Sequence, residues 1–277
     1  MPTRAWLLVV GASSLLAAHS AFASEAPSPR PVTMEQVRSL TVPSPYRIPD
    51  SARRGTIWYR IIVRGDIAGW PWPETGEQHV VRTGEEVELT ICRDCGEEVA
   101  PTQETLKSMT SSTEWLQSSD GEVVSFSREA RGGSVDKRMR KLVAAVRSRL
   151  SGGVTYDGYL SARDALRERE GDCTEYALLL AAAARARGIP ARVVAGLAYG
   201  SRFVGRPHAF GPHMWVQAWT GKRWVSYDAG LGAFDAGHIA LMVGDGSPES
   251  FAGVLGLIRS LRIVDAAGIL PPENAGR

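Results

Sequence analysis

The chain of 277 residues is long enough for one large domain or two modest ones, and its 44% hydrophobic and 8% aromatic content is ordinary for a globular protein. The formal net charge of +2, from 32 basic and 30 acidic residues, is nearly balanced. No bulk electrostatic field therefore favours nucleic acid or an anionic membrane as the main partner, and function must be inferred from a site.

The first 23 residues have the pattern of a secretory signal peptide. Arg4 supplies a positive charge, residues 5–18 form an uncharged apolar stretch, and residues 21–23 are Ala-Phe-Ala, a small-x-small cleavage pattern. The alternative is an uncleaved N-terminal anchor, although the apolar stretch is shorter than the ~20 residues that a membrane-spanning helix needs. We therefore expect a mature protein that begins near Ser24 and is periplasmic or secreted, without stable insertion in a membrane.

Two regions of different composition follow the signal peptide. Residues 24–50 contain six prolines, which favour extended conformations, so we expect an extended segment there, either a tether or an arm. Residues 51–125 are expected to form a β-rich accessory unit, because residues 56–63, 79–82 and 85–91 have the composition of strands.

Two of the three cysteines lie close together in the β-rich unit. Cys92 and Cys95 form a Cys-Arg-Asp-Cys sequence, and in an oxidising compartment we expect them to pair as a disulfide. Two alternatives stay open: a zinc site, which would have only His79 nearby as a further ligand, and a redox-active pair, which lacks a surrounding βαβ pattern. Cys173 is then left alone, and an unpaired thiol in an exported protein indicates either deep burial or a function.

The domain that carries the chemistry is expected over residues 126–277. Its first helix is predicted over residues 134–150, where six apolar residues recur at spacings of three and four, and Gly152 follows as a stop signal. The other face of this helix is basic. Such a face could bind an anionic polymer, but solvated lysines and arginines on an outer helix are commoner.

Cys173 begins the most hydrophobic helix predicted in the chain. Asp172 can cap this helix, and Glu175 three positions later completes the spacing of a capping box. The unpaired N–H groups and the positive end of the helix dipole would stabilise a thiolate and could receive an oxyanion. Because residues 178–184 are three leucines and four alanines, we expect the helix to be buried and to hold Cys173 rigidly.

His213 and Asp228 lie on the two strands of a predicted hairpin. Residues 213–219 and 224–228 have the composition of strands and are separated by a four-residue turn, after an earlier strand over 191–199. Each register that the turn favours places His213 on the same face as Asp228, opposite or diagonal to it, within reach of a hydrogen bond.

These three residue types fit nucleophilic catalysis. An aspartate can fix the tautomer of an imidazole, whose other nitrogen then faces a thiol. Taken singly, each residue has a structural explanation: a buried cysteine, a polar residue at a strand start, and a turn former. Taken together, Cys173, His213 and Asp228 predict a catalytic triad.

Several segments of this region resemble the core of the bacterial transglutaminase-like superfamily. They are Gly-Asp-Cys-Thr-Glu-Tyr-Ala at 171–177, Arg-Ala-Arg-Gly-Ile-Pro-Ala-Arg at 185–192, the Gly-x-x-Tyr strand at 196–199, His-Met-Trp-Val at 213–216 and Tyr-Asp at 227–228. The motifs are specific in combination, and their order and spacing agree with the family over residues 134–245.

The resemblance implies an α+β fold with a papain-like transglutaminase core, in which the helix bearing the cysteine packs on an antiparallel sheet, together with the N-terminal β-rich unit. It also implies that Cys173 is the nucleophile, His213 the general base and acid, and Asp228 the orienting residue. Where the family often has Asp-Pro, this chain has Asp-Ala, which keeps the carboxylate. Tyr156 and Tyr159 are candidates for a side-chain oxyanion donor, and each could equally be a core residue.

The expected function is that of a cysteine-dependent amide-bond enzyme that acts through an acyl-thioester on a protein or peptide. Hydrolysis, as in a peptidase or deamidase, is our first choice because water is the default acceptor. One alternative is a protein-glutamine transglutaminase that cross-links to an amine, and another is a non-catalytic binding module with a retained fold. A third is acyl transfer from a coenzyme A thioester. The amide-bond reactions require no metal or organic cofactor.

Overall fold

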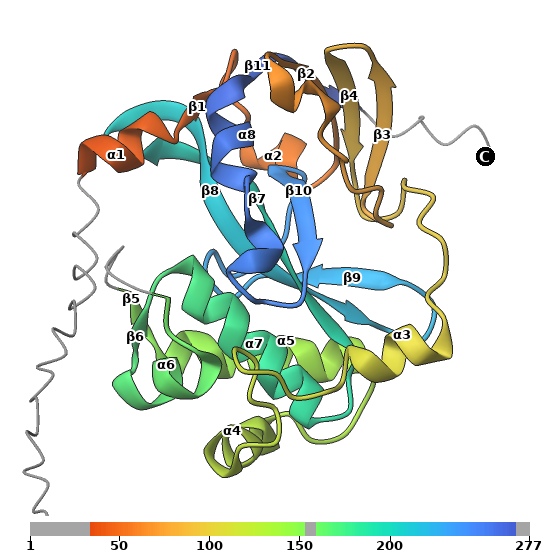
Figure 1. Ribbon diagram of the computed structural model, residues 1–277, viewed down its shortest axis with the longest axis vertical. Coiled ribbons are helices and arrows are strands. Elements are labelled where there is room, and N and C mark those ends of the chain that lie inside the picture. The colour runs from red at the N-terminus through yellow and green to blue at the C-terminus, as the bar shows by residue number, and fades with distance from the viewer. Residues whose placement is uncertain (1–33, 153–158, 270–277) are drawn as a thin grey trace, which may run out of the picture. The chain divides into compact units, whose positions relative to one another are not determined.

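The computed structural model describes residues 34–152 and 159–269, and within them two large antiparallel sheets organise the chain (Figure 1). The first sheet has five strands in the order β1-β8-β7-β10, with β9 paired to the same edge of β8 as β1. Its strands are β1 (Val42–Pro43), β7 (Ala191–Phe203), β8 (Arg206–Trp219), β9 (Trp224–Tyr227) and β10 (His238–Gly244). The predicted hairpin is therefore present, and β8 begins seven residues earlier than expected.

The second sheet has four strands in the order β11-β2-β4-β3. They are β2 (Thr56–Val63), β3 (Gln78–Thr83), β4 (Glu86–Ile91) and β11 (Leu261–Ile269). The first three agree with the strands predicted from composition. The edge strand β11, however, comes from the other end of the chain and pairs along β2 from Leu261 opposite Val63 to Ile269 opposite Thr56. This sheet is thus not built from residues 51–125 alone.

The helices that support the cysteine gather around α7 (Cys173–Ala186). α7 packs on β7 and β8, and α4 (Gly121–Phe126), α5 (Val135–Arg149) and α6 (Ala162–Glu168) pack against α7. Figure 1 shows this helical group on one side of the five-stranded sheet. The remaining elements are short: α1 (Met34–Ser39), α2 (Asp50–Arg53), α3 (Gln103–Ser108), α8 (Val254–Ser260), the β5–β6 pair (Ser151–Gly152 with Glu170–Gly171) and single 3₁₀ turns.

Residues 34–50, which we expected to be an extended arm, are mostly docked on the fold. They contain α1, β1 and the start of α2, and β1 adds to β8 with Val42 opposite Phe210. Val42 and Ile48 are buried in the core, which explains why a proline-rich segment is held in place. The predicted signal peptide at 1–23 and residues 24–33 lie outside the described residues.

Residues 99–125, expected within the β-rich unit, are helical in part. Thr102 caps α3 by accepting a hydrogen bond from Thr105 N, and Asp120 caps α4 by accepting from Glu122 N and Val123 N. α4 packs against α7, so this part of the chain belongs structurally with the cysteine-bearing helix.

The five-stranded sheet is buried on both sides, which makes it a rigid support. Val193 and Val216 belong to the hydrophobic cluster formed with the helices, whereas Leu197 and Phe210 belong to the cluster formed with the second sheet. Gly196 allows the close packing of β7 on β10, because a Cβ there would lie 2.1 Å from the carbonyl oxygen of Ile239. Among the described residues, no helix has the length and apolar character to cross a membrane.

Candidate active site

The N-terminus of α7 has the capping structure that the sequence predicts. Asp172 Oδ1 accepts a hydrogen bond of 2.8 Å from Thr174 N, and Glu175 Oε2 accepts one of 2.9 Å from Asp172 N, which completes a capping box. Glu175 is buried, and its Oε1 also accepts from Leu160 N at 3.0 Å. Cys173 is therefore fixed in the first turn of a buried helix, where the residue as a whole stays partly exposed although its thiol is buried.

His213 and Asp228 meet as the hairpin predicts. Val216 pairs with Tyr227, and continuing this register places His213 opposite Gly230, one of the two arrangements expected. Nε2 of His213 lies 2.8 Å from Oδ2 of Asp228, and both side chains are buried. This bond leaves Nδ1 of the imidazole free for another partner.

Gly230 marks the point where the three predicted residues converge. A Cβ built on this glycine would lie 3.1 Å from Cε1 of His213, 3.3 Å from Oδ1 of Asp228 and 3.8 Å from Cα of Cys173. In addition, the backbone N–H of Met214, the neighbour of His213, faces the thiol and favours its ionised form. The structure thus brings Cys173, His213 and Asp228 together from three separate stretches of chain.

Asp228 is held as a carboxylate by four donors. Its Oδ1 accepts hydrogen bonds from Gly230 N at 2.7 Å and Leu231 N at 3.1 Å, and its Oδ2 receives the imidazoles of His213 and His238. Burial alone would raise the pKa of this carboxyl group, but the charges and hydrogen bonds of the two histidines lower it far below its usual value. Asp228 is therefore ionised throughout the neutral range.

The Cys173 thiol is in an environment that opposes an isolated thiolate. Burial and the carboxylate of Asp172 raise the pKa of the thiol well above its ordinary value, and Asp228 and Glu175 act in the same direction. These contributions outweigh the N–H of Met214. The expectation that the helix terminus would lower this pKa is not met, because burial of the thiol and the acidic caps of the same helix raise it.

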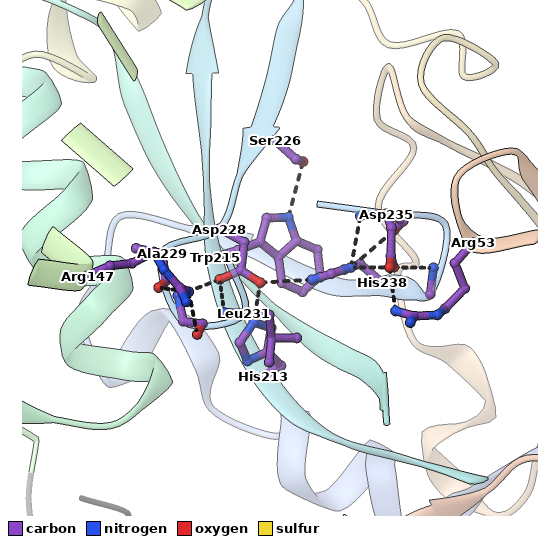
Figure 2. A network of polar contacts seen from close by, with 12 residues as sticks. Arg53, Arg147, His213, Trp215, Ser226, Asp228, Ala229, Leu231, Asp235 and His238 are labelled. Carbon is purple, nitrogen blue, oxygen red and sulfur yellow. Dashed lines mark hydrogen bonds and ion pairs between the residues drawn. The ribbon is translucent and has the colours of Figure 1, made fainter. Parts of the chain in front are cut away.

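His238 is a residue of this site that the sequence analysis missed. It begins β10, its Nε2 lies 3.0 Å from Asp228 Oδ2, and its Nδ1 lies 3.2 Å from Oδ1 of Asp235. Figure 2 shows the resulting line of side chains from His213 through Asp228 and His238 to Asp235 and Arg53. The available signal was a histidine directly before the apolar run 239–243, ten residues after the aspartate.

Ligand atoms of His213, Asp228 and His238 lie within 4.8 Å of one another, so these residues were considered as a metal-binding group. The two N···O separations, 2.8 and 3.0 Å, are those of N–H···O hydrogen bonds. We therefore describe the three side chains as a hydrogen-bonded chain.

Of the two tyrosines considered as oxyanion donors, the structure describes only Tyr159. Tyr159 donates its hydroxyl to the carbonyl of Gly246 at 2.9 Å and packs edge-on against Trp115, so it has a structural role in this conformation. Tyr156 lies outside the described residues.

The cysteine pair of the β-rich region is a disulfide. Cys92 and Cys95 are bonded, with their Cα atoms 5.8 Å apart, as predicted. His79, the only nearby ligand for the alternative zinc site, lies with its Nδ1 3.2 Å from Glu74 Oε1 instead.

A cavity of about 980 Å³ lies between α5 and β9, next to the loop that follows Asp228. Arg140, Arg147 and Arg223 line it, together with Gly232 of this loop. Arg147 Nη1 donates to the carbonyl oxygens of residues 229 and 230 at 3.0 and 3.1 Å. One wall of the cavity is therefore formed by the loop that contains Gly230, the glycine beside His213 and Cys173.

Comparisons with known proteins give a family for the segment that carries these residues. Residues 123–229 match the sequence profile of the Transglutaminase-like superfamily, a segment that runs from α4 to the loop after β9 and contains all three predicted residues. Residues 123–229 therefore carry a transglutaminase-like core.

Individual relatives are distant. "Uncharacterized protein ML0607" of Mycobacterium leprae is 40% identical over 70 residues, which are 24% of this chain and 25% of that protein. A candidate cysteine protease of Cytophaga hutchinsonii has a TM-score of 0.47 at 16% identity, over 78% of this chain and 83% of that one. The periplasmic domain of TgpA from Pseudomonas aeruginosa has a TM-score of 0.43 at 16% identity, over 69% and 87%. The family assignment rests on the sequence match, since neither structure reaches a TM-score of 0.5.

Proposed function

We propose that the protein is a cysteine-dependent amide-bond enzyme in which Cys173 is the nucleophile, His213 the general base and acid, and Asp228 the orienting carboxylate. The observation that carries this proposal is the 2.8 Å bond from His213 Nε2 to Asp228, which leaves Nδ1 as the nitrogen available to the Cys173 side of the ring. A Cβ built on Gly230 would lie within 4 Å of atoms of all three residues, which supports their proximity.

The first step forms an acyl-thioester. The proton of the Cys173 thiol passes to Nδ1 of His213, and the sulfur attacks the carbonyl carbon of an amide. The raised pKa of the thiol supports this route, because a buried thiolate is favoured only when the imidazolium that balances its charge forms beside it. The negative oxygen of the tetrahedral intermediate would be received by the backbone N–H of Cys173, since the Asp172 cap occupies that of Thr174. His213 then protonates the leaving amine, and the C–N bond breaks.

We propose that water resolves the acyl-thioester. His213 takes a proton from the water, the hydroxide adds to the thioester carbonyl, the C–S bond breaks to release a carboxylic acid, and His213 returns the proton to the sulfur to restore the thiol. The reaction is then peptide cleavage or glutamine deamidation. Amine attack on the same thioester would instead give a cross-linked product, and the acceptor decides between these outcomes. None of these steps requires a redox change.

We also propose that the enzyme is exported. The leader-like pattern of residues 1–23 supports this location, and so does the Cys92–Cys95 disulfide, a bond that persists mainly in oxidising compartments.

The test is to incubate the mature protein with a panel of glutamine-containing peptides, with and without an added primary amine, and to follow the products by mass spectrometry. Cleavage, deamidation and amine incorporation give three different mass changes. We expect hydrolysis products from the wild type and none from Cys173→Ala. A matched control is Cys92→Ala/Cys95→Ala, which removes the other two sulfurs and should keep the activity. If wild type and Cys173→Ala behave alike across the panel, the proposal is refuted.

A further inference from the structure

Asp228 shares one oxygen between two imidazoles. Oδ2 lies 2.8 Å from His213 Nε2 and 3.0 Å from His238 Nε2, whereas Oδ1 is occupied by two backbone N–H groups. For both imidazoles to donate, each must carry its proton on Nε2. The orientation of the Asp228 carboxylate is then determined from both sides (Figure 2).

Behind His238 the network continues with alternating charge. His238 Nδ1 lies 3.2 Å from Asp235 Oδ1, and Arg53 Nη1 lies 2.5 Å from Asp235 Oδ2. With oxygens of Asp228 and Asp235 at its two nitrogens, the His238 ring can donate on both sides, which only the imidazolium form can do. The N–H of Asp235, 3.3 Å from Nδ1, would instead require that nitrogen to be unprotonated, but the carbonyl and carboxylate oxygens of Asp235 lie closer to Nδ1, at 3.1 and 3.2 Å, and favour a proton there. The ring is almost completely buried between the side chains of Trp215 and Phe234.

The charged and titratable groups around His238 come from several elements. Asp228 and Asp235 contact its ring directly, the ring centroid of His213 is 5.6 Å away, and Arg53 lies beyond Asp235. Farther out are Tyr59 and Tyr199, near Asp235 and Arg53, and Glu77, in the small cleft that His238 also lines. The two contacting carboxylates are closer to the ring than the Arg53 guanidinium, which lies beyond Asp235. The local charge therefore favours a proton on both ring nitrogens.

We propose that His238 is a positioning residue of the active site, which as an imidazolium holds the Asp228 carboxylate toward His213 and offsets part of its negative charge. This inference rests on the proposed function of Cys173, His213 and Asp228. It adds a fourth residue that does not touch the substrate and acts through Asp228 alone.

The positive charge of His238 should change the ionisation of the Cys173–His213 pair in a direction that can be measured. A fixed positive charge near the Cys173–His213 pair favours each loss of a proton from that pair. The deprotonated form of the pair is less positive or more negative than the protonated form, so the fixed charge stabilises it. Removing the charge of His238 should therefore move the ionisation of the pair to higher pH. Two unit charges at the ring separation of 5.6 Å interact strongly enough for a shift of about one pH unit.

The protonation of His238 is supported by its surroundings. Burial lowers its pKa, but hydrogen bonds and charges of Asp228 and Asp235 outweigh burial and raise the pKa to about 9. His238 is then a cation at neutral pH and becomes neutral only as the pH rises through that value.

The experiment measures the rate of Cys173 alkylation by iodoacetamide as a function of pH, in wild type, His238→Gln and His238→Leu. The glutamine amide can still donate to Asp228 but carries no charge, whereas leucine removes donor and charge together. We expect the profile of His238→Gln to move up by about one pH unit. His238→Leu should show the same shift and, in the peptide assay, a turnover at least about ten-fold lower. The matched control is His79→Gln, a half-exposed histidine paired with Glu74, which should leave the profile unchanged.

The outcomes separate this inference from the proposed function. If Cys173 of the wild type is no more reactive than the same thiol in the unfolded chain, the proposed function fails. If Cys173 is reactive and the profile of His238→Gln coincides with that of the wild type, the inference about His238 is overturned. Should the variants fail to fold, ¹⁵N spectra of the wild-type histidines decide: we expect His238 to carry two ring protons at neutral pH, and a neutral ring there would refute the proposal.

Discussion

His213 and Asp228 are joined by an Nε2···Oδ2 contact of 2.8 Å that links strand β8 to the residue directly after strand β9. Because Oδ1 of the same carboxylate is occupied by the N–H groups of residues 230 and 231, Asp228 cannot rotate without losing further hydrogen bonds. The imidazole is thereby held in one tautomer and one orientation. Reactivity of Cys173 should depend on this fixed geometry.

Replacing Asp228 by asparagine should disable the site without unfolding the protein. The amide oxygen should take the place of Oδ1, which accepts the two backbone N–H groups, so the NH₂ group would face His213. An NH₂ there requires an unprotonated Nε2 and moves the imidazole proton to Nδ1, where it can no longer accept the thiol proton. We expect kcat to fall by about 10²- to 10⁴-fold, as for triads of this kind. Peptide turnover measures this loss, and a fall of less than a few-fold would contradict it.

Replacing Gly230 by alanine should displace the imidazole of His213. The new Cβ would lie 3.1 Å from Cε1 of His213 and 3.3 Å from Oδ1 of Asp228, closer than ordinary contacts. We expect kcat to fall by about 10- to 100-fold, since small misplacements of reacting groups have effects of that size. The control is Gly121→Ala at the start of α4, where a Cβ meets open space. Equal activity of the two variants would show that catalysis does not depend on the position of the His213 imidazole.

Glu175 should make folding stability depend on pH. Burial and the nearby carboxylate of Asp172 raise the pKa of Glu175 from 4.5 to about 7. The folded chain then keeps a proton that the unfolded chain has released, so this contribution to stability is complete below pH 4.5 and is lost as the pH rises through 7. From about pH 4.5 to 8, the unfolding free energy of the wild type should fall relative to Glu175→Gln by up to about 3 kcal/mol.

Urea denaturation at both ends of this pH range measures the Glu175 effect. Glu104→Gln on α3, an exposed position, is the control and should show no such change. A difference between wild type and Glu175→Gln that is the same at both pH values would mean that Glu175 does not titrate between them.

The disulfide should stabilise the fold without taking part in the reaction. It closes a short loop, with a sequence separation of three residues between Cys92 and Cys95. The loop-entropy relation gives a loss of about 2 kcal/mol in unfolding free energy for Cys92→Ala/Cys95→Ala. Cys173 alkylation and peptide turnover should stay at the wild-type level at a temperature where the variant is folded. Loss of turnover in this folded variant would instead indicate a redox role for the pair.

The parts of the site that the sequence predicted are those with local signals. The α7 cap follows from Asp172 and Glu175, three residues apart, and the hairpin follows from two strand-like runs around a short turn. Both need only contacts between residues close in the chain. The contact between His213 and Asp228 can therefore be predicted from the sequence, which limits the register of the hairpin to two arrangements.

The parts that the sequence did not predict depend on contacts between distant segments. β11 pairs with β2 across about two hundred residues of chain, and no local pattern selects that partner. His238 reaches Asp228 only because β10 lies beside β7 in the same sheet. The raised pKa of the Cys173 thiol likewise results from burial and from carboxylates gathered by the fold, which a helix-dipole argument omits.

The most direct test of the account compares the rate of Cys173 alkylation at about pH 6 in the wild type and in His213→Ala, because an isolated thiol is almost entirely protonated there. His208→Ala is the matched control, a histidine that contacts Tyr199 instead of the site. The account predicts that the wild type and His208→Ala react alike and that His213→Ala reacts at least about ten-fold more slowly. Equal rates in all three proteins would contradict the central claim that His213 activates Cys173.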